Sequence, residues 1–329
     1  MKLVLGILGI CLLVFTLSCH PSAPKGDGNL ASNDSLAHIW DTIQGTIIAT
    51  IEWDDQNHKQ KLRIWAGFNN GKYYRLSSGL GENYFYSGDT VKNNIVNLED
   101  SLLYSKFNKY EIYRLGVPAG NAEVSGTVFS QSCDASICGK IKQFHIPGIN
   151  AEDPQYTFIG LCGKKKSTFD NISAIQPLDS GVYASFLPQL RHIGKNLMDQ
   201  NKKEEYEYQS LKIDSSKISF SVKMANLDAD KKPEYIAEGY LDVDSEHSYH
   251  CLLMYHTPGF GIDTFYHDVS LEKTDGDFTF ELIDALDIDG DGNKELVFSY
   301  LGPGGMVYVI YSYEKGVLIR KFSTEAWGC

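Results

Sequence analysis

Two segments of the chain carry side-chain oxygens at alternate positions, a pattern that suits a hard metal ion. Residues 224–235 align with residues 285–296 at an offset of 61, and each segment runs into an apolar stretch typical of a β-strand. Calcium is bound by roughly six to eight oxygens at ~2.3–2.6 Å, which alternate carboxylates on a turning backbone can supply together. Gly292 lets the backbone reverse without the steric cost of a Cβ atom. We therefore predict Ca²⁺ as the cofactor of these segments.

The spacing excludes an EF-hand, because Phe298 stands twelfth from Asp287, where an EF-hand places its closing Glu. The second segment instead resembles the Asp-x-Asp-Gly-Asp-Gly loops of FG-GAP (VCBS-like) repeats, found in integrin-α-type β-propellers and many bacterial surface proteins. The resemblance covers about residues 215–329 and implies antiparallel, propeller-blade-like β repeats, each with one calcium ion. The ligands it implies are Asp287, Asp289, Asp291, Asn293 and Glu295 in the second segment, and Asn226, Asp228, Asp230 and Glu234 in the first.

The first segment departs from the pattern at three positions, with Asn226 at the start, Lys231 in place of a glycine, and Pro233. It is therefore expected either to bind calcium weakly or to hold no metal, its aspartates only shaping the turn. For both segments the alternative is a plain hairpin turn, because Asp and Gly favour turns without any ion. Two copies are too few for a propeller, so we expect a small open β unit.

The first residues read as a sorting signal. Residues 3–15 form an uncharged apolar run of 13 residues, too short to span a bilayer as a helix but suited to a signal-peptide core. The run ends in Thr16-Leu17-Ser18-Cys19, which resembles the lipobox of bacterial lipoproteins. That resemblance implies a signal peptide over residues 1–18 and a lipid on Cys19. The alternative is an ordinary secretory signal with Cys19 as a plain thiol.

The residues after Cys19 support a tether. Residues 19–37 are rich in Pro, Ser, Gly and Asn and poor in large apolar side chains, so they are predicted to be a flexible spacer. The expected location is the cell envelope, with a lipid anchor in the bilayer, and the outer membrane is preferred.

Charge and cysteine content set further bounds. The formal net charge of -12 argues against a nucleic-acid partner, whose phosphates need basic side chains. In an oxidising envelope, cysteines are expected to pair. The disulfide candidates are Cys133, Cys138, Cys162, Cys251 and Cys329. A zinc site made by the first three is the alternative, and a transition-metal site at His247, His250 and His256 is a further, weaker one.

Apolar alternation and frequent turn residues predict a mainly β fold. Residues 38–200 are expected to form an N-terminal antiparallel β domain that ends in one helix, residues 187–200. Residues 207–329 are expected to form the calcium-repeat β domain, with the boundary near residues 200–207.

Together these features favour a non-enzymatic role. The expected function is a lipid-anchored, calcium-binding module that presents a rigid surface to a protein or glycan partner. The alternative is an envelope hydrolase with its active site in the N-terminal domain, for which the sequence offers no nucleophile motif.

Overall fold

The structure is a computed structural model that describes residues 45–54, 59–69, 71–75, 104–130, 136–147, 157–163, 175–204, 209–228, 230, 232–244, 247–256, 264–273, 280–302, 305–314 and 317–324. The predicted signal peptide, tether and lipidation site at Cys19 lie outside these residues, as do Cys133 and Cys329. Within them the prediction of a mainly β, antiparallel fold with one long helix is confirmed.

The N-terminal strands form a closed, barrel-like sheet. Its strands are β1 (Thr46–Asp54), β2 (Lys59–Asn69), β3 (Lys72–Arg75), β4 (Lys109–Arg114), β5 (Val117–Ser130), β6 (Ser136–His145) and β7 (Phe158–Cys162). The order is β1-β7-β4-β5-β6-β2, and β1 also pairs with β2, which closes the ring and leaves β3 attached beside β2. Ile64 and Leu62 on β2 and Ile47 on β1 are among its buried apolar side chains.

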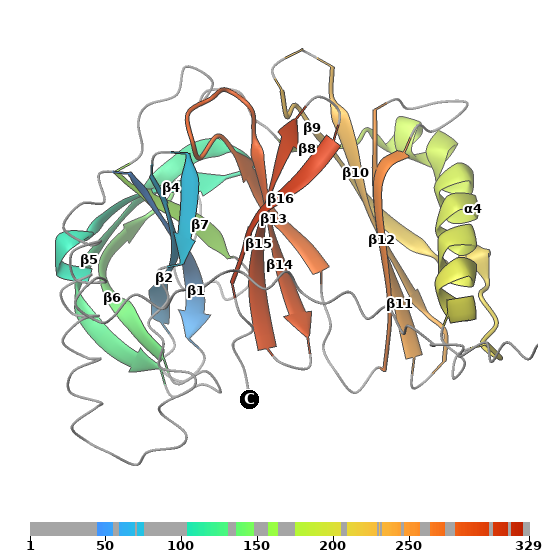
Figure 1. The fold of residues 1–329 in the computed structure, drawn as a ribbon, viewed down its shortest axis with the longest axis horizontal. Helices are drawn as coiled ribbons and strands as arrows, with labels where there is room; N and C mark the ends of the chain where they lie inside the picture. The colour runs from blue at the N-terminus through green and yellow to red at the C-terminus, as the bar shows by residue number, and fades with distance from the viewer. Residues whose placement is uncertain are drawn as a thin grey trace, which may run out of the picture. The chain divides into compact units, whose positions relative to one another are not determined.

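Two open antiparallel sheets follow along the chain (Figure 1). The five-stranded sheet has the order β12-β11-β10-β9-β8, and the four-stranded sheet has the order β13-β14-β15-β16. Their strands are β8 (Ile175–Pro177), β9 (Ser219–Ala225), β10 (Glu234–Asp242), β11 (His247–Tyr255), β12 (Thr264–Lys273), β13 (Phe280–Leu286), β14 (Glu295–Gly302), β15 (Gly305–Glu314) and β16 (Val317–Ser323).

The sequence repeat folds as two four-stranded meanders, β9–β12 and β13–β16, each with an acidic segment between its first two strands. The first hairpins of the two repeats have the same register. Glu234 pairs with Ala225 in the first, and Glu295 pairs with Leu286, each 61 positions later, in the second. Each repeat therefore has the blade-like form that the sequence predicted.

Successive side chains of a strand point to opposite faces, so each open sheet buries two faces. On the five-stranded sheet, Ala237 and Leu253 pack with the long helix, whereas Ile236 and Leu252 pack with the four-stranded sheet. On the four-stranded sheet, Val297 faces a cluster that includes Trp65, Ile48 and Tyr113 of the closed sheet. The four-stranded sheet is therefore in contact with both other sheets.

The helix α4 (Ser180–Glu204) lies along one face of the five-stranded sheet (Figure 1). The Asp179 carboxylate accepts hydrogen bonds from the N–H groups of Gly181 and Val182 at 2.9 and 3.2 Å, an N-cap that starts the helix. Gly194 allows close approach to the sheet, because a Cβ there would lie 3.0 Å from Phe220 and 3.5 Å from Cys251. The helix begins earlier than predicted and contains Pro188.

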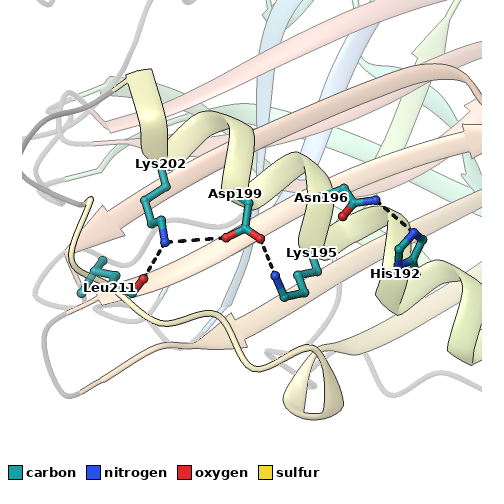
Figure 2. Close-up of polar contacts among 6 residues, drawn as sticks. All are labelled: His192, Lys195, Asn196, Asp199, Lys202 and Leu211. Carbon is teal, nitrogen blue, oxygen red and sulfur yellow. Dashed lines mark hydrogen bonds and ion pairs between the residues drawn. The ribbon is translucent and has the colours of Figure 1, made fainter.

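Ion pairs along α4 hold its last turns. Figure 2 shows Asp199 between Lys195 and Lys202, and it pairs with both. Lys202 also donates to the backbone carbonyl of Leu211 at 2.7 Å, which ties the segment after the helix to its last turn. In the same view Asn196 lies 3.2 Å from the ring of His192.

The helix does not belong to the N-terminal sheet, where the sequence analysis placed it. The strand β8 pairs with β9, and α4 packs against β9, β11 and β12. Residues 43–329 also group into a single unit, so the structure shows no division near residues 200–207. The physical reason is burial: the apolar face of α4 is covered by Phe220 and Tyr249, not by the closed sheet.

Candidate metal centre

The two acidic segments are the connections of two equivalent hairpins. Acidic loop 1 (residues 226–234) joins β9 to β10, and acidic loop 2 (residues 287–295) joins β13 to β14. In the part of the chain that the structure describes, only these loops bring together three or more side chains able to hold a metal ion. Each cluster can hold a metal ion.

In acidic loop 2, carboxylate oxygens of Asp287, Asp289 and Glu295 all lie within 4.8 Å of one another. Asp287 and Glu295 are 0% and 1% exposed, whereas Asp289 is half-buried. Burying two carboxylates beside a third is costly unless a cation or hydrogen bonds offset their charge. The cluster is therefore suited to a hard cation.

Backbone hydrogen bonds fix one oxygen of each buried carboxylate. The N–H of Gly290 donates to Asp287 Oδ1 at 2.7 Å, and the N–H of Ile288 donates to Glu295 Oε2 at 2.7 Å. The second oxygens, Asp287 Oδ2 and Glu295 Oε1, are buried and have no hydrogen-bond partner among the described residues. Two unsatisfied oxygens on residues of one cluster are what a cation would satisfy.

The backbone of loop 2 adopts the turn that the glycines were expected to allow. Gly290 and Gly292 have φ of 81° and 96°, a region that glycine enters without strain. Asp289 Oδ1 accepts the N–H of Asp291 at 3.0 Å, and Asp291 Oδ1 accepts the N–H of Asn293 at 2.7 Å. This chain of contacts curves the loop around the three clustered carboxylates.

One of the ligands implied for loop 2, Asp291, lies outside its cluster of acids. The Asn293 amide donates to Asp291 Oδ2 at 3.1 Å, and Asp291 is exposed. The structure thus brings together Asp287, Asp289 and Glu295, and leaves the exposed Asp291 bonded to the half-buried Asn293.

Acidic loop 1 repeats most of this geometry. Its cluster contains Asp228, Asp230 and Glu234. The N–H of Leu227 donates to Glu234 Oε2 at 2.9 Å, which matches the bond from Ile288 to Glu295 in loop 2. Asp230 is exposed, and the half-buried Asn226 occupies the position of the buried Asp287. Loop 1 is therefore the more open of the two.

Burial and mutual repulsion raise the pKa values of the clustered acids. Burial, followed by repulsion from Asp289, raises the pKa of Glu295 well above its ordinary value. Burial also raises the pKa of Asp289, and the nearby charges of Asp291 and Asp287 add to the shift. In loop 1, burial raises the pKa of Glu234 to about 7. A bound cation would reverse these shifts, because it favours the charged carboxylates.

The loops are joined to each other and to the closed sheet. The N–H of Lys294 in loop 2 donates to the carbonyl of Leu227 in loop 1 at 2.6 Å. The carbonyl of Ile288 in loop 2 accepts a hydrogen bond from Thr46 Oγ1 of β1 at 3.4 Å. The two clusters are therefore linked through backbone groups.

Comparison with known protein families, curated proteins and solved structures found no match. The geometry of the loops is thus the main guide to function. Within the described residues, no helix is both long and apolar enough to cross a membrane.

The histidines of the alternative metal site have separate partners. His247 Nδ1 lies 2.8 Å from Asp244, His250 packs edge-on against Tyr240, and His256 lies 3.4 Å from the Tyr313 hydroxyl. They form no common cluster with one another in the described part of the chain.

The cysteines that the structure describes do not pair with one another. Cys138 and Cys251 are buried and Cys162 is half-buried, and no disulfide joins any two of them. A Cys138–Cys162 bridge, one of the pairings expected among Cys133, Cys138 and Cys162, is therefore absent. Bridges to Cys133 and Cys329 concern residues outside the described set.

One residue near the cluster escaped the sequence analysis. Tyr73 of β3 lines a cavity together with Asp289 and Glu295 of loop 2. More than 200 residues separate it from the loop, and a tyrosine in a short strand carries no local signal of such a role. Only the packing of the closed sheet against the repeats brings it there.

Proposed function

We propose that this protein is a calcium-binding β module in which the ion bound in acidic loop 2 rigidifies a surface for a protein or glycan partner. One observation carries the proposal: Asp287 Oδ2 and Glu295 Oε1, which belong to residues clustered with Asp289, are buried and find no hydrogen-bond partner among the residues described. A buried carboxylate oxygen without a partner is costly, and a cation would offset that cost.

The donor set favours calcium over other metals. All clustered donors are carboxylate oxygens, which suit hard cations, whereas zinc and copper prefer nitrogen and sulfur ligands. The irregular loop offers a flexible shell, which calcium accepts more readily than magnesium. The resemblance to FG-GAP repeats points to the same ion. Loop 1 would bind more weakly, since Asn226 replaces the buried Asp287.

Calorimetric titration of the full chain with Ca²⁺, Mg²⁺ and Zn²⁺ tests the proposal. The unmodified chain should bind Ca²⁺ more tightly than the other two ions, and Asp287→Asn should remove the tighter calcium site. The matched control is Glu123→Gln, which changes a half-buried acid that pairs with Lys142 on the closed sheet. Absence of calcium binding, or equal binding by Asp287→Asn, would refute the proposal.

An envelope location completes the proposed role. The lipobox-like sequence Thr16-Leu17-Ser18-Cys19 and the spacer over residues 19–37 support a lipid anchor at Cys19. Expression in a bacterium with labelled fatty acid should label the chain, and Cys19→Ala should remain unlabelled and leave the membrane fraction. Label on the Cys19→Ala chain would contradict the anchor.

A further inference from the structure

The hydroxyl of Tyr73 is buried, and the structure shows no hydrogen-bond partner for it among the residues described. It lines a cavity of about 350 Å³ that Asp289 and Glu295 of acidic loop 2 also line. The Tyr73 ring packs against Phe68 at 4.9 Å and Phe322 at 6.2 Å between centroids, so its direction is fixed on both sides. A buried hydroxyl without a partner is as uncommon as a partnerless carboxylate.

Electrostatics place this hydroxyl within range of the cluster. Burial raises the pKa of Tyr73 far above its ordinary value, and the charge of Glu295, followed by that of Asp289, raises it further. Tyr73 is therefore a neutral phenol, which can both donate and accept a hydrogen bond. The cavity is large enough for water, and a water held by a cation would be a strong donor to the phenol oxygen.

We infer that Tyr73 is a positioning residue of the metal site in acidic loop 2, where its hydroxyl bonds a water ligand of the bound ion. The inference rests on the proposed binding of calcium. It makes the site bipartite, with carboxylates from the four-stranded sheet and a hydroxyl from β3 of the closed sheet. The bound ion then strengthens the contact between the two sheets.

Acidic loop 1 offers the contrasting case. The hydroxyl of Tyr313 on β15 is also near acids, since burial and then the charges of Glu234 and Asp228 raise its pKa. Its hydroxyl, however, lies 3.4 Å from His256 Nδ1 and so has a protein partner. Tyr313→Phe is therefore the matched control for Tyr73→Phe.

Terbium tests the inference, because Tb³⁺ replaces Ca²⁺ at oxygen sites and emits when a nearby tyrosine absorbs light. The full chain would carry Asp228→Asn and Glu234→Gln, so that loop 1 contributes no site. In this background Tyr73→Phe should reduce the tyrosine-sensitised emission, and it should weaken Ca²⁺ binding about tenfold, as expected for the loss of one hydrogen bond to a water ligand. Tyr313→Phe should change neither.

Urea unfolding in chelator separates this role from packing. Phenylalanine keeps the ring contacts, so Tyr73→Phe should leave the midpoint in chelator unchanged or slightly higher. A midpoint that falls equally in chelator and in calcium would overturn the inference, as would unchanged calcium affinity and emission in Tyr73→Phe. Either of those outcomes leaves the metal site standing, whereas absence of ion binding to the parent chain would overturn the proposed function itself.

Discussion

The hydroxyl of Tyr308 on β15 donates a hydrogen bond of 2.6 Å to Glu52 on β1, joining residues 256 positions apart. Glu52 also accepts from Thr50 at 2.7 Å, and Arg63 lies 3.5 Å from its other oxygen. The Tyr308 ring stacks on Trp65 with centroids 5.2 Å apart. Burial would raise the pKa of Glu52, but Arg63 and the hydrogen bonds together lower it. The carboxylate is thus held charged at the contact between the closed sheet and the four-stranded sheet.

Tyr308→Phe should destabilise the fold by about 1.5–3 kcal/mol at neutral pH, because it removes a hydrogen bond to a charged group and keeps the ring. Because the pKa of Glu52 is lowered, its charged carboxylate stabilises the fold above the ordinary pKa of 4.5. This stabilisation is lost as the pH falls through the lowered pKa. The cost of the substitution should therefore shrink in acid. Urea unfolding at neutral and acidic pH measures both effects.

The control for this substitution is Tyr183→Phe, whose hydroxyl donates to the uncharged carbonyl of Phe220 at 3.0 Å. Its cost should be about 1 kcal/mol and should not depend on the titration of Glu52. Equal costs for the two variants at every pH would contradict the role of the Glu52 charge.

Asp284 should make stability fall as pH rises through neutrality. It is 1% exposed and accepts the N–H groups of Gly116 at 2.6 Å and Ala285 at 2.8 Å. Burial raises its pKa to about 7, so the folded state holds a proton that the unfolded chain releases at lower pH. The contribution of Asp284 to the free energy of unfolding is fully present below its ordinary pKa of 3.8. This contribution falls by roughly 4 kcal/mol as the pH rises from there to above 7.

Asp284→Asn keeps the acceptor oxygen and removes the charge, so its stability should change less between pH 4 and 8, as measured by urea unfolding in chelator. Asp214→Asn is the control, because Asp214 is exposed and the Ser216 hydrogen bonds lower its pKa. If the Asp284→Asn profile is as steep as that of the parent chain, the buried carboxyl is not its source.

Calcium should raise the thermal midpoint of the protein that begins at residue 20 and so carries neither the predicted signal peptide nor Cys19. At a free concentration about 100 times the dissociation constant, the gain is about 2.7 kcal/mol. Asp289→Ala should abolish the gain, and in chelator it should cost little, because the half-buried carboxylate is then repelled by its neighbours. An equal loss of stability in chelator would mean that Asp289 only shapes the turn.

Gly239 should not tolerate a methyl group. A Cβ there would lie 2.5 Å from Cys251 Sγ and 2.5 Å from the Phe220 ring. Gly239→Ala should therefore cost about 1–3 kcal/mol. Adding Cys251→Ala should recover part of the loss, measured by urea unfolding as a double-mutant cycle. Additive costs would show that the sulfur is not the obstacle.

Local sequence patterns were sufficient to predict the β fold, the helix and the repeat. The constant offset of 61 residues predicted that Glu234 and Glu295 open equivalent strands. Periodicity reports only which face of an element is apolar. It does not report which surface covers that face, so α4 was assigned to the wrong neighbour.

The candidate site, too, was predicted from the sequence only in its local features. The alternation of acids predicted both clusters, yet it treated Asp291 as equal to Asp287, although one is exposed and the other fully buried. Burial in loop 2 depends on contacts with the closed sheet, such as Thr46 with Ile288, which no pattern within the loop encodes. Tyr73 was missed for the same reason.

The bond between Lys294 and Leu227 joins the two repeats at their loops. Pro233 occupies the position of Lys294 in loop 1 and lacks the N–H that would reach a preceding repeat. Ile288 occupies the position of Leu227 in loop 2, and its carbonyl accepts from Thr46, not from the backbone of a following repeat. Neither loop therefore offers this backbone bond on its other side. A third blade inserted beside either loop would lack the backbone bond that joins the first two.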